Sequence, residues 1–316
     1  MHILITGSRG FIGRTFKQAL ERAGHTVLGG VSPGRPPGPG ECVMDFARDT
    51  RPEVWLPRLQ GVEAVINTVG VLRDSRSRPI DAVHRDTPMA LFSACAQAGV
   101  QRVVQISALG IEGSQTRYAS TKRAADQHLL ALAARPGGPG AVVLRPSVVF
   151  GRGGASSAMF MGLARLPVAV FPGPMLTARV QPVSVHDLAE AVVALLGPAL
   201  DQRGIIECTG PAPLSLGELV ASLRTQSGHR PAWVLRLPDA LTALMYGRPE
   251  DERMASYARA AEEALPHAPD PGARIKSSRS GFALSFIASS AHGGKKPLIR
   301  AYHGPRSKQR RGVGVS

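Results

Sequence analysis

Short apolar runs alternate with helix-like segments through the first half of this 316-residue chain. The runs predicted as strands are "HILIT" (2–6), "HTVLGGV" (25–31), "CVMDF" (42–46), "EAVINTVG" (63–70), "RVVQIS" (102–107) and "AVVLRP" (141–146). Helices are predicted over residues 11–23, 80–98 and 117–134. Strands this continuously apolar are typical of a parallel sheet covered by helices on both faces. The sequence therefore predicts an α/β fold with a doubly wound parallel sheet.

The alternation loosens after Gly151. Short strands are predicted near residues 168–171 and 178–184, and a helix is predicted after His186 and Asp187. A further strand, "GIIECTG" (204–210), precedes a helix over 215–227. The expected division is residues 1–150 as the sheet domain, with 186–210 returning to it, residues 151–185 and 211–265 as a smaller C-terminal lobe, and residues 266–316 as a tail.

The tail explains most of the formal net charge of +15. Residues 271–316 hold ten Lys or Arg and no Asp or Glu, so the rest of the chain carries only +5. Such a polar, basic segment cannot bury enough apolar surface to offset the entropy of ordering it. We expect residues 266–316 to form a disordered tail with no specific nucleic-acid partner, and residues 271–316 to be dispensable. A tail that contacts RNA or an anionic membrane is the alternative.

The composition of the whole chain favours a globular protein, with 43% hydrophobic and 19% charged residues. No run of about 18 apolar residues is present, and the N-terminus leads directly into "HILIT", so neither a membrane span nor a signal peptide is indicated. The expected location is cytoplasmic. The three cysteines, Cys42, Cys95 and Cys208, are odd in number and lie in apolar contexts. They are interpreted as buried thiols, and no metal site is expected.

The segment "TGSRGFIG" (6–13) places Gly7, Gly10 and Gly13 between a predicted strand and a predicted helix. This is the context in which a dinucleotide-binding loop uses bare backbone and a helix N-terminus to approach a pyrophosphate. The alternative is a structural strand-to-helix turn. The spacing is Gly-x-x-Gly-x-x-Gly, which differs from the Gly-x-Gly-x-x-Gly pattern of many dinucleotide-binding proteins.

Seven segments, in order, resemble the short-chain dehydrogenase/reductase superfamily in its extended or atypical branches. They are "TGSRGFIG", "MDF", "NTVG", "QISALG", "YASTK", "LRPSVVFG" and "QPVSVHDLAEAV". The resemblance extends along residues 1 to about 245. The chain is most similar to atypical members related to the accessory complex I subunit and to epimerase-like proteins of nucleoside-diphosphate sugars. The resemblance implies a Rossmann-type fold with a smaller C-terminal substrate lobe and a nicotinamide dinucleotide cofactor.

The residues after the second strand indicate which cofactor is used. No acidic residue lies in "VLGGVSPGRPPGPG", whereas Arg35 follows the strand and Arg9 lies in the glycine-rich loop. Basic residues here accommodate the additional phosphate of NADP, so NADP(H) is favoured, with NAD as the alternative. A solvated loop charge is the other interpretation of Arg35. The predicted loop contacts come from Gly7, Arg9, Gly10, Phe11, Ile12 and Gly13.

Further cofactor contacts follow from the resemblance. It implies that Asp45 contacts the adenine amine, that the segment from Asn67 to Gly70 lines the adenine and ribose side, and that Pro146 turns the chain over the nicotinamide. A turn at the end of a strand is the structural alternative for Asp45.

The segment "YASTK" carries the predicted chemistry. A spacing of four places Tyr118 and Lys122 on one helical face, where the ammonium is expected to lower the pKa of the phenol. Tyr118 would then exchange a proton with an alcohol or carbonyl while the cofactor carries the hydride. Lys122 would also hold the nicotinamide ribose. Tyr-x-x-x-Lys also occurs by chance, so its place between "VVQIS" and "LRPSVVFG" supports this interpretation.

A hydroxyl that binds the substrate oxygen is expected at the end of the preceding strand. Ser107 is the best candidate, with Ser114 and Ser120 as alternatives and a capping role as the structural interpretation. Ala108 lies where many extended enzymes carry a second serine, which weakens the predicted triad. His186 and Asp187 are interpreted as the start of a helix capped by Ser184 or Asp187.

Two classes of function are consistent with the sequence. One is an NAD(P)-dependent oxidoreductase or epimerase-like enzyme that acts on a small-molecule carbonyl or alcohol. The other is an NADP(H)-binding sensor or assembly protein without turnover. Between residues 151 and 185 the basic residues are Arg152, Arg165 and Arg179, and "MFMGLARLPVAVF" is apolar. A quinone, lipid or isoprenoid-like carbonyl is therefore an alternative to a sugar nucleotide, unless these residues form the core of the lobe.

Overall fold

A computed structural model represents the chain. It describes residues 1–34, 36–173, 176, 178–197, 202–230, 232–238, 282–287 and 298–303. No helix in these ranges is long and apolar enough to cross a membrane.

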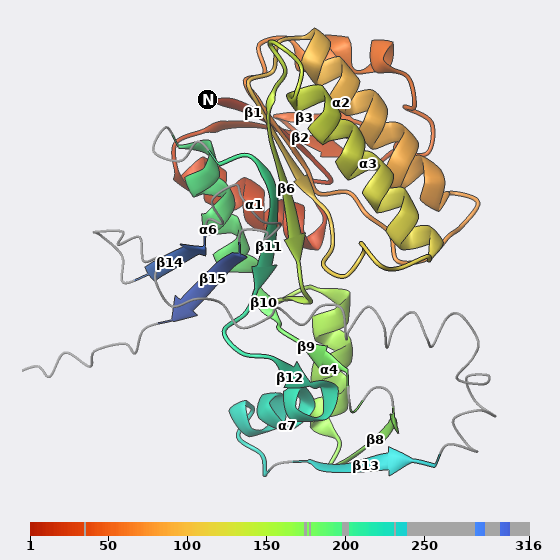
Figure 1. Cartoon of the computed structure of the whole chain (residues 1–316), viewed down its shortest axis with the longest axis vertical. Helices are drawn as coiled ribbons and strands as arrows, with labels where there is room; N and C mark the ends of the chain where they lie inside the picture. Colours follow the sequence, from red (N-terminus) through yellow and green to blue (C-terminus); the bar gives the residue numbers. More distant parts are fainter. Residues whose placement is uncertain are drawn as a thin grey trace, which may run out of the picture.

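A parallel sheet forms the centre of the described structure (Figure 1). Its strands are β1 (His2–Thr6), β2 (Thr26–Val31), β3 (Glu41–Val43), β4 (Ala64–Asn67), β5 (Arg102–Ile106), β6 (Gly140–Pro146) and β11 (Gly204–Thr209). Their spatial order is β3-β2-β1-β4-β5-β6-β11, with all neighbours parallel. The order reverses direction between β1 and β4, and ligands of such sheets bind at this point, beyond the carboxyl ends of the strands. The predicted doubly wound, Rossmann-type fold is confirmed.

Helices cover both faces of the sheet. They are α1 (Phe11–Arg22), α2 (Thr87–Gln97), α3 (Arg117–Ala133) and α6 (Val185–Leu196), with short helical turns η1 (Pro52–Val54), η2 (Leu56–Leu59) and η3 (Ala82–Asp86). Helices α1 and α6 lie on one face, and α2 and α3 lie on the other (Figure 1). The helix expected over residues 80–98 is divided, because η3 is a π-helical turn that leads into α2.

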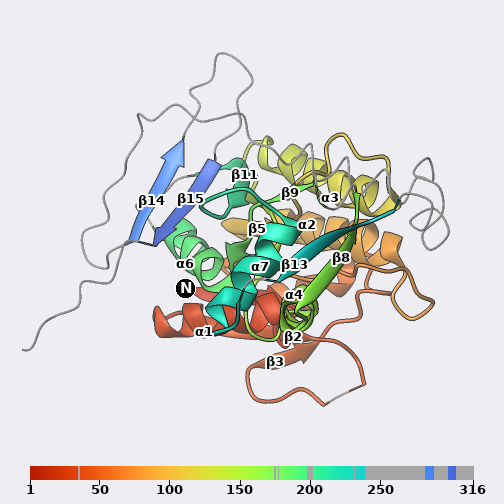
Figure 2. The same ribbon diagram turned by 90° about the horizontal axis from the view of Figure 1, so that it is seen from below.

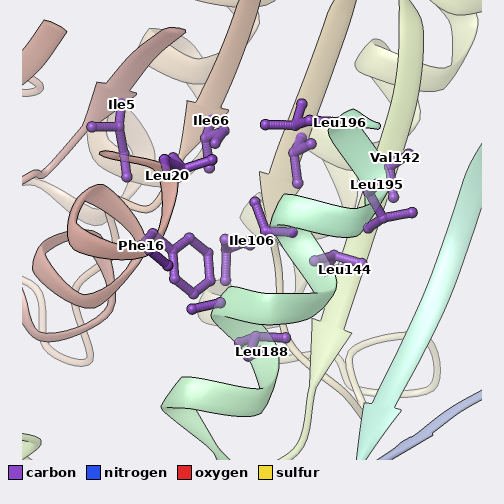
Figure 3. Packing of buried hydrophobic residues seen from close by; sticks show 14 of the residues in the cluster. Ile5, Phe16, Leu20, Ile66, Ile106, Val142, Leu144, Leu188, Leu195 and Leu196 are labelled. Carbon is purple, nitrogen blue, oxygen red and sulfur yellow. The ribbon is translucent and has the colours of Figure 1, made fainter. Parts of the chain in front are cut away.

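The core on the α1–α6 face shows why the helices adopt these positions. Phe16 of α1 points toward α6, which carries Leu188, and Leu20 lies beside Ile66 of β4 (Figure 3). Both α1 side chains are fully buried. Burial of each such side chain contributes about 1.5–3 kcal/mol, so the apolar stripe of the helix fixes α1 against the sheet.

The smaller lobe lies beyond the carboxyl ends of β6 and β11 (Figure 1). Its main elements are α4 (Ala155–Arg165), β8 (Val168–Pro172), α7 (Leu216–Gln226) and β13 (Trp233–Leu237), joined by the short strands β7 (Val149–Phe150), β9 (Arg179–Val180), β10 (Val183–Ser184) and β12 (Leu214–Ser215). Strands β8 and β13 lie side by side and pair in parallel (Figure 2). Helices α4 and α7 pack against one face of this pair through Phe160, Phe171 and Val220. Helix α4 and strand β13 are elements that the sequence pattern did not reveal.

The predicted disorder of the tail is wrong at two segments. Strand β15 (Leu298–His303) pairs in parallel with β11, and strand β14 (Phe282–Ile287) pairs antiparallel with β15. The sequence runs "FALSFI" and "LIRAYH" are locally rich in strand-forming residues, which the basic composition of the surrounding tail obscured. Pairing with β15 also satisfies the backbone groups along the edge of β11. The rest of residues 266–316 lies outside the described residues.

Candidate functional site

The loop after strand β1 needs its three glycines for different geometric reasons. Gly7 has φ +68°, in the left-handed region that other residues rarely adopt. A Cβ atom on Gly13 would lie 2.2 Å from the carbonyl oxygen of Gly7 and 2.8 Å from the hydroxyl oxygen of Thr68. The N–H of Gly10 donates to the same Gly7 oxygen at 2.8 Å, and a Cβ atom on Gly10 would lie 3.0 Å from it. Only glycine lets helix α1 approach β1 and β4 this closely.

Helix α1 begins without a side-chain cap, because its N-cap residue is Gly10. The N–H groups of Phe11, Ile12 and Gly13 lie in its first turn, where the helix itself supplies no acceptor. The first turn also carries no acidic side chain. These N–H groups and the positive end of the helix dipole favour an anion such as a phosphate. The loop residues predicted to hold a pyrophosphate therefore lie together at one helix terminus.

Arg9 is already paired in this structure. Its Nε donates to Oε1 of Glu41 at 3.1 Å, a second guanidinium nitrogen bonds Oε2 of Glu41, and another bond reaches the carbonyl of Pro36 at 3.1 Å. Hydrogen bonding to Arg9 holds the pKa of Glu41 below its ordinary value. Sequence reasoning missed Glu41, which lies at the start of β3 and next to the glycine-rich loop only after folding. Arg35 lies outside the described residues.

Asp45 forms a turn after strand β3. Its Oδ1 accepts a hydrogen bond from the N–H of Ala47 at 3.0 Å, and its own N–H donates to Oδ2 of Asp49 at 2.9 Å. This is the structural alternative considered for Asp45. A contact of Asp45 with an adenine amine stays a prediction.

Asn67 joins three neighbouring strands through buried hydrogen bonds. Its Oδ1 accepts from Thr6 Oγ1 at 2.6 Å, and its Nδ2 donates to Gln105 Oε1 at 2.7 Å. All three side chains are fully buried. Both polar groups of the Asn67 amide are thus used inside the sheet. A cofactor contact from this segment is consequently expected from the backbone between Thr68 and Gly70.

Tyr118 and Lys122 lie on the first turns of α3, beside the segment that follows β4. The hydroxyl of Thr116 caps the helix by accepting from the N–H of Ala119 at 3.3 Å. Lys122 is buried, and its ammonium donates to the carbonyl of Ile106 at the end of β5, with an N···O distance of 3.1 Å. A Cβ atom added to Gly70 would lie 3.4 Å from Lys122 Nζ. The fold therefore brings Lys122 to the carboxyl edge of the sheet.

The pKa of Tyr118 shifts in the direction opposite to the sequence-based expectation. Burial, with a smaller contribution from the negative charge of Asp126, raises the pKa of Tyr118 to about 12. Burial lowers the pKa of Lys122 to about 8, against a smaller opposing effect of Asp126. Burial and the charge of Asp126 account for the shift, and the expected lowering of the phenol pKa by the Lys122 ammonium does not appear. Tyr118 therefore holds its proton at neutral pH.

His84, on the π-helical turn η3, contacts both Tyr118 and the segment after β4. Its ring meets the Tyr118 ring edge to face, with centroids 5.1 Å apart and an interplanar angle of 88°. Its Nε2 accepts a hydrogen bond from the N–H of Val71 at 2.9 Å. Burial and the nearby Lys122 lower the pKa of His84 to about 3, so the ring is neutral. His84 was missed in the sequence, where a single histidine in a helix carries no signal.

Ser107 is buried and its proton is committed to Asp126. Ser107 Oγ donates to Oδ2 of Asp126 at 2.8 Å, and the same oxygen accepts from Arg145 Nε at 3.2 Å and Nη2 at 3.0 Å. Asp126 is fully buried, and Arg145 is 2% exposed. The remaining bond of Arg145 goes to Glu112. In this arrangement Ser107 can accept a hydrogen bond from a ligand but does not offer it a proton.

This buried network was not foreseen, although the sequence contains two signals for it. Asp126 lies four residues after Lys122 on the same helical face. Arg145 is a charged residue within the apolar strand β6. Burial raises the pKa of the Asp126 carboxyl, and Arg145, Ser107 and Lys122 oppose that shift.

The remaining candidates make local contacts. Ser114 Oγ lies 3.0 Å from Thr116 Oγ1, and Ser120 Oγ donates to the carbonyl of Arg117 at 3.2 Å. Ser184 caps α6 by accepting from the N–H groups of His186 and Asp187, as predicted. Strand β6 ends at Pro146, and the carbonyl of Pro146 accepts from the N–H of Leu109 at 3.0 Å.

The cysteines are free thiols. Cys95 and Cys208 are buried and Cys42 is partly buried, and burial raises the pKa of the Cys208 thiol to about 12. Among the described residues, no group of three or more His, Cys, Asp or Glu side chains could hold a metal ion.

Comparison with known proteins found a matching family model and a curated relative. The model of the "NAD dependent epimerase/dehydratase family" matches residues 3–206. A "Ceramide reductase" of Caulobacter vibrioides is 30% identical over 203 residues, which cover 61% of this chain and 60% of that protein. The chain thus matches less than two thirds of the length of this relative.

Solved structures share the fold at lower identity. MoeE5 in complex with UDP-glucose and NAD has a TM-score of 0.60 and 21% identity, over 84% of this chain and all of that one. UDP-glucuronic acid 4-epimerase from Bacillus cereus, in complex with NAD, has a TM-score of 0.61 and 18% identity, over 83% of this chain and 97% of that one. These similarities establish the architecture of the chain.

Replacement of Lys122 by Met should alter how stability depends on pH. Between pH about 8 and about 10.5 the folded protein has released the Lys122 proton and the unfolded chain still holds it. The free energy of unfolding of the parent protein should rise by up to about 3 kcal/mol more than that of Lys122→Met across this window. Urea denaturation at several pH values measures the difference between the two proteins. Both proteins contain the same buried cysteines, so the effect of thiol ionisation on stability cancels in this difference. Parallel pH profiles would contradict the buried, depressed pKa.

Replacement of Asp126 by Asn should destabilise the protein by about 3–5 kcal/mol, because it leaves the buried Arg145 guanidinium without its buried carboxylate. The matched control is Glu112→Gln, which removes the exposed partner of the same arginine. Its side chain is 48% exposed, so the loss should stay below about 1 kcal/mol. Urea denaturation of both variants tests the asymmetry, and equal losses would show that Asp126 is not the main counter-charge.

Proposed function

The chain belongs to the NAD-dependent epimerase/dehydratase family, and on that premise we propose that it is an NAD(P)-dependent oxidoreductase of the short-chain dehydrogenase/reductase type. In this proposal Tyr118 transfers the proton and Lys122 holds the nicotinamide ribose. The observation that carries the proposal is the position of both side chains at the carboxyl edge of the sheet, beside the segment from Thr68 to Val71.

The protonation states favour reduction of a carbonyl over oxidation of an alcohol. The cofactor, when bound, supplies a hydride to the carbonyl carbon. Tyr118, whose pKa is raised to about 12, holds its proton at neutral pH and donates it to the carbonyl oxygen. The neutral ring of His84 packs against Tyr118 and keeps the phenol oriented. Lys122 donates to the carbonyl of Ile106 and has further protons for a ribose hydroxyl.

Ser107 has a positioning role in this proposal. Its hydroxyl proton is held by Asp126, so it can accept a hydrogen bond from a substrate alcohol and does not donate one to a carbonyl. Tyr118 is then the group that donates to the substrate oxygen. The lack of a second serine at Ala108 agrees with this reduced role.

We propose an apolar carbonyl compound as the substrate. Two observations support it. The relative with 30% identity is a ceramide reductase, which names a lipid substrate for that protein. In the lobe, Arg179 is paired with Glu218 at 2.8 Å and is not available to a diphosphate without breaking that pair. A sugar nucleotide, as bound by the MoeE5 structure, is the alternative substrate.

A preference for NADP(H) is the second part of the proposal. Arg9 lies in the glycine-rich loop, and we propose that it moves from Glu41 to the additional phosphate of NADP(H), with Arg35 as its partner. The solved neighbours bind NAD, which makes NAD the alternative cofactor. The Arg9–Glu41 pair is exposed on the arginine side, so exchanging one anion for another carries a modest cost.

A cofactor-binding protein without turnover is the second candidate. The engaged Ser107 hydroxyl favours it, because that hydroxyl does not donate a hydrogen bond to a substrate carbonyl. A cytoplasmic location is proposed for either function. The experiments below separate the two.

Tyr118→Phe should reduce carbonyl reduction by about 10²–10⁴-fold and leave NADPH affinity nearly unchanged. Phenylalanine keeps the ring that packs on His84 and removes only the proton donor. Lys122→Met should lower both turnover and cofactor affinity. Turnover is followed by NADPH absorbance with long-chain aldehydes and ketones, and affinity by fluorescence titration. Equal turnover of Tyr118→Phe and the parent protein would overturn the proposed role of Tyr118. No turnover of either protein, with cofactor binding intact, would support the non-catalytic alternative.

Glu41→Gln should bind NADPH about tenfold more tightly, because it frees Arg9 from its counter-charge. Arg9→Gln and Arg35→Ala should weaken NADPH binding and leave NADH binding almost unchanged. Arg22→Gln, exposed at the end of α1, is the control for a general loss of positive charge. If Glu41→Gln instead weakens NADH binding and does not improve NADPH binding, Glu41 serves the ribose hydroxyls and the cofactor is NAD.

A further inference from the structure

The two-stranded sheet of the lobe has one face against helices and one face exposed to water. Ala169 and Phe171 of β8 are buried against α4 and α7. The alternate residues of the same strand, Val168 and Val170, point to the other side and are 41% and 52% exposed. Because side chains alternate along a strand, this second face is a continuous surface and not a set of isolated residues.

Strand β13 extends the exposed face with larger side chains. Trp233 pairs in register with Val168, and Leu235 pairs with Val170. Trp233 is 75% exposed and Leu235 is 50% exposed. We define the outer face as Leu166, Val168, Val170, Trp233 and Leu235. Large apolar side chains gathered on one face mark an interaction surface, whereas single exposed ones do not.

Arginine residues lie at one end of the outer face. The guanidinium of Arg224 donates to the carbonyls of Ala164 and Arg165 at 3.1 and 2.8 Å, and to that of Arg230 at 2.6 Å. This side chain holds the segments before β8 and β13 together, so that Arg165 and Arg230, both exposed, flank the same end of the sheet.

Acidic residues are scarce in the described parts of the lobe that contain the helices and strands of this sheet. Residues 152–173 contain no Asp or Glu, and residues 211–238 contain only Glu218. Glu218 is paired with Arg179. An apolar surface with an exposed tryptophan and a basic rim is complementary to an anionic lipid bilayer, where Trp settles at the interface and Arg contacts lipid phosphates.

We propose that the outer face docks the protein onto an anionic lipid surface. This inference goes beyond the proposed function, and binding to the surface does not depend on turnover. It gives the lobe a second role, because the same lobe lies beyond the carboxyl edge of the sheet, where a substrate is proposed to bind.

The two tryptophans of the chain provide a direct reporter. Trp55 is fully buried, whereas Trp233 is the most exposed large apolar residue of the outer face. Vesicles of phosphatidylcholine with about 30% phosphatidylglycerol should shift the emission of the full-length protein to the blue, and pure phosphatidylcholine vesicles should do so far less. Trp233→Phe should abolish the shift. Lipids that carry a quencher in the acyl chain should quench the Trp233 fluorescence of the parent protein. This test does not require a variant protein.

Co-sedimentation with the same vesicles measures docking. Trp233→Ser and Leu235→Ser should each lower partition by about tenfold, since each removes a large apolar side chain from the contact. Arg165→Gln with Arg230→Gln should remove the preference for anionic vesicles, as should about 0.5 M salt. Val43→Ser and Arg22→Gln, which alter exposed residues of the sheet domain, should bind like the parent. Thermal unfolding verifies that each variant is folded.

Each other outcome overturns the proposal. Sedimentation with vesicles without a change in Trp233 emission would assign the binding to the basic residues after 270. A blue-shifted emission that depends on protein concentration, together with a dimer in sedimentation velocity, would assign the face to a second copy. Blue-shifted Trp233 emission in buffer without vesicles, at every protein concentration, would show that the outer face is covered by the chain's own segment after residue 238. Equal partition of Trp233→Ser and the parent would exclude the outer face from docking.

Discussion

The buried ion pair between Asp126 and Arg145 is the interaction on which the candidate site depends. It joins helix α3 to strand β6, and Oδ2 of Asp126 also accepts the proton of Ser107 at the end of β5. Lys122 lies one helical turn before Asp126 and faces the same buried region. A buried arginine without its carboxylate is costly, so the pair fixes the rotation of α3 about its axis. The position of Tyr118 relative to the sheet follows from that rotation.

Local patterns in the sequence were sufficient to predict the main strands and helices of the sheet domain. The runs "HILIT" and "RVVQIS" became β1 and β5, and the segments 11–23 and 117–134 became α1 and α3 within one residue at their ends. The spacing of apolar residues identifies each of these elements locally. The alternation of strands with helices along the chain predicts that the strands pair in parallel. Strand β13 was not recognised because its neighbour β8 lies far away in the sequence, and its outer side chains are apolar where a polar residue is expected.

The sequence predicts candidate residues for the site but not the interactions that they make. Tyr118, Lys122 and the glycines were identified from spacing, and the fold brings them to one edge of the sheet. The partners of Arg9 and Ser107 were not visible, because Glu41 and Asp126 approach them only after the chain folds. The surroundings of Tyr118 also form only when the chain folds, so the sequence predicted the wrong direction for its pKa shift. Spacing indicates how near a charge lies, whereas desolvation depends on the whole surroundings.

The parallel pairing of β8 with β13 has a consequence for the order of folding. Parallel strands cannot be joined by a tight turn, and here the connection contains α6, β11 and α7. Pairing of β8 with β13 therefore closes a long loop, and the entropic cost of that closure is smaller once β11 lies beside β6 in the main sheet. Contacts that span so much sequence form late and slowly. The lobe is thus expected to remain open in a newly synthesised chain until the central sheet is nearly complete.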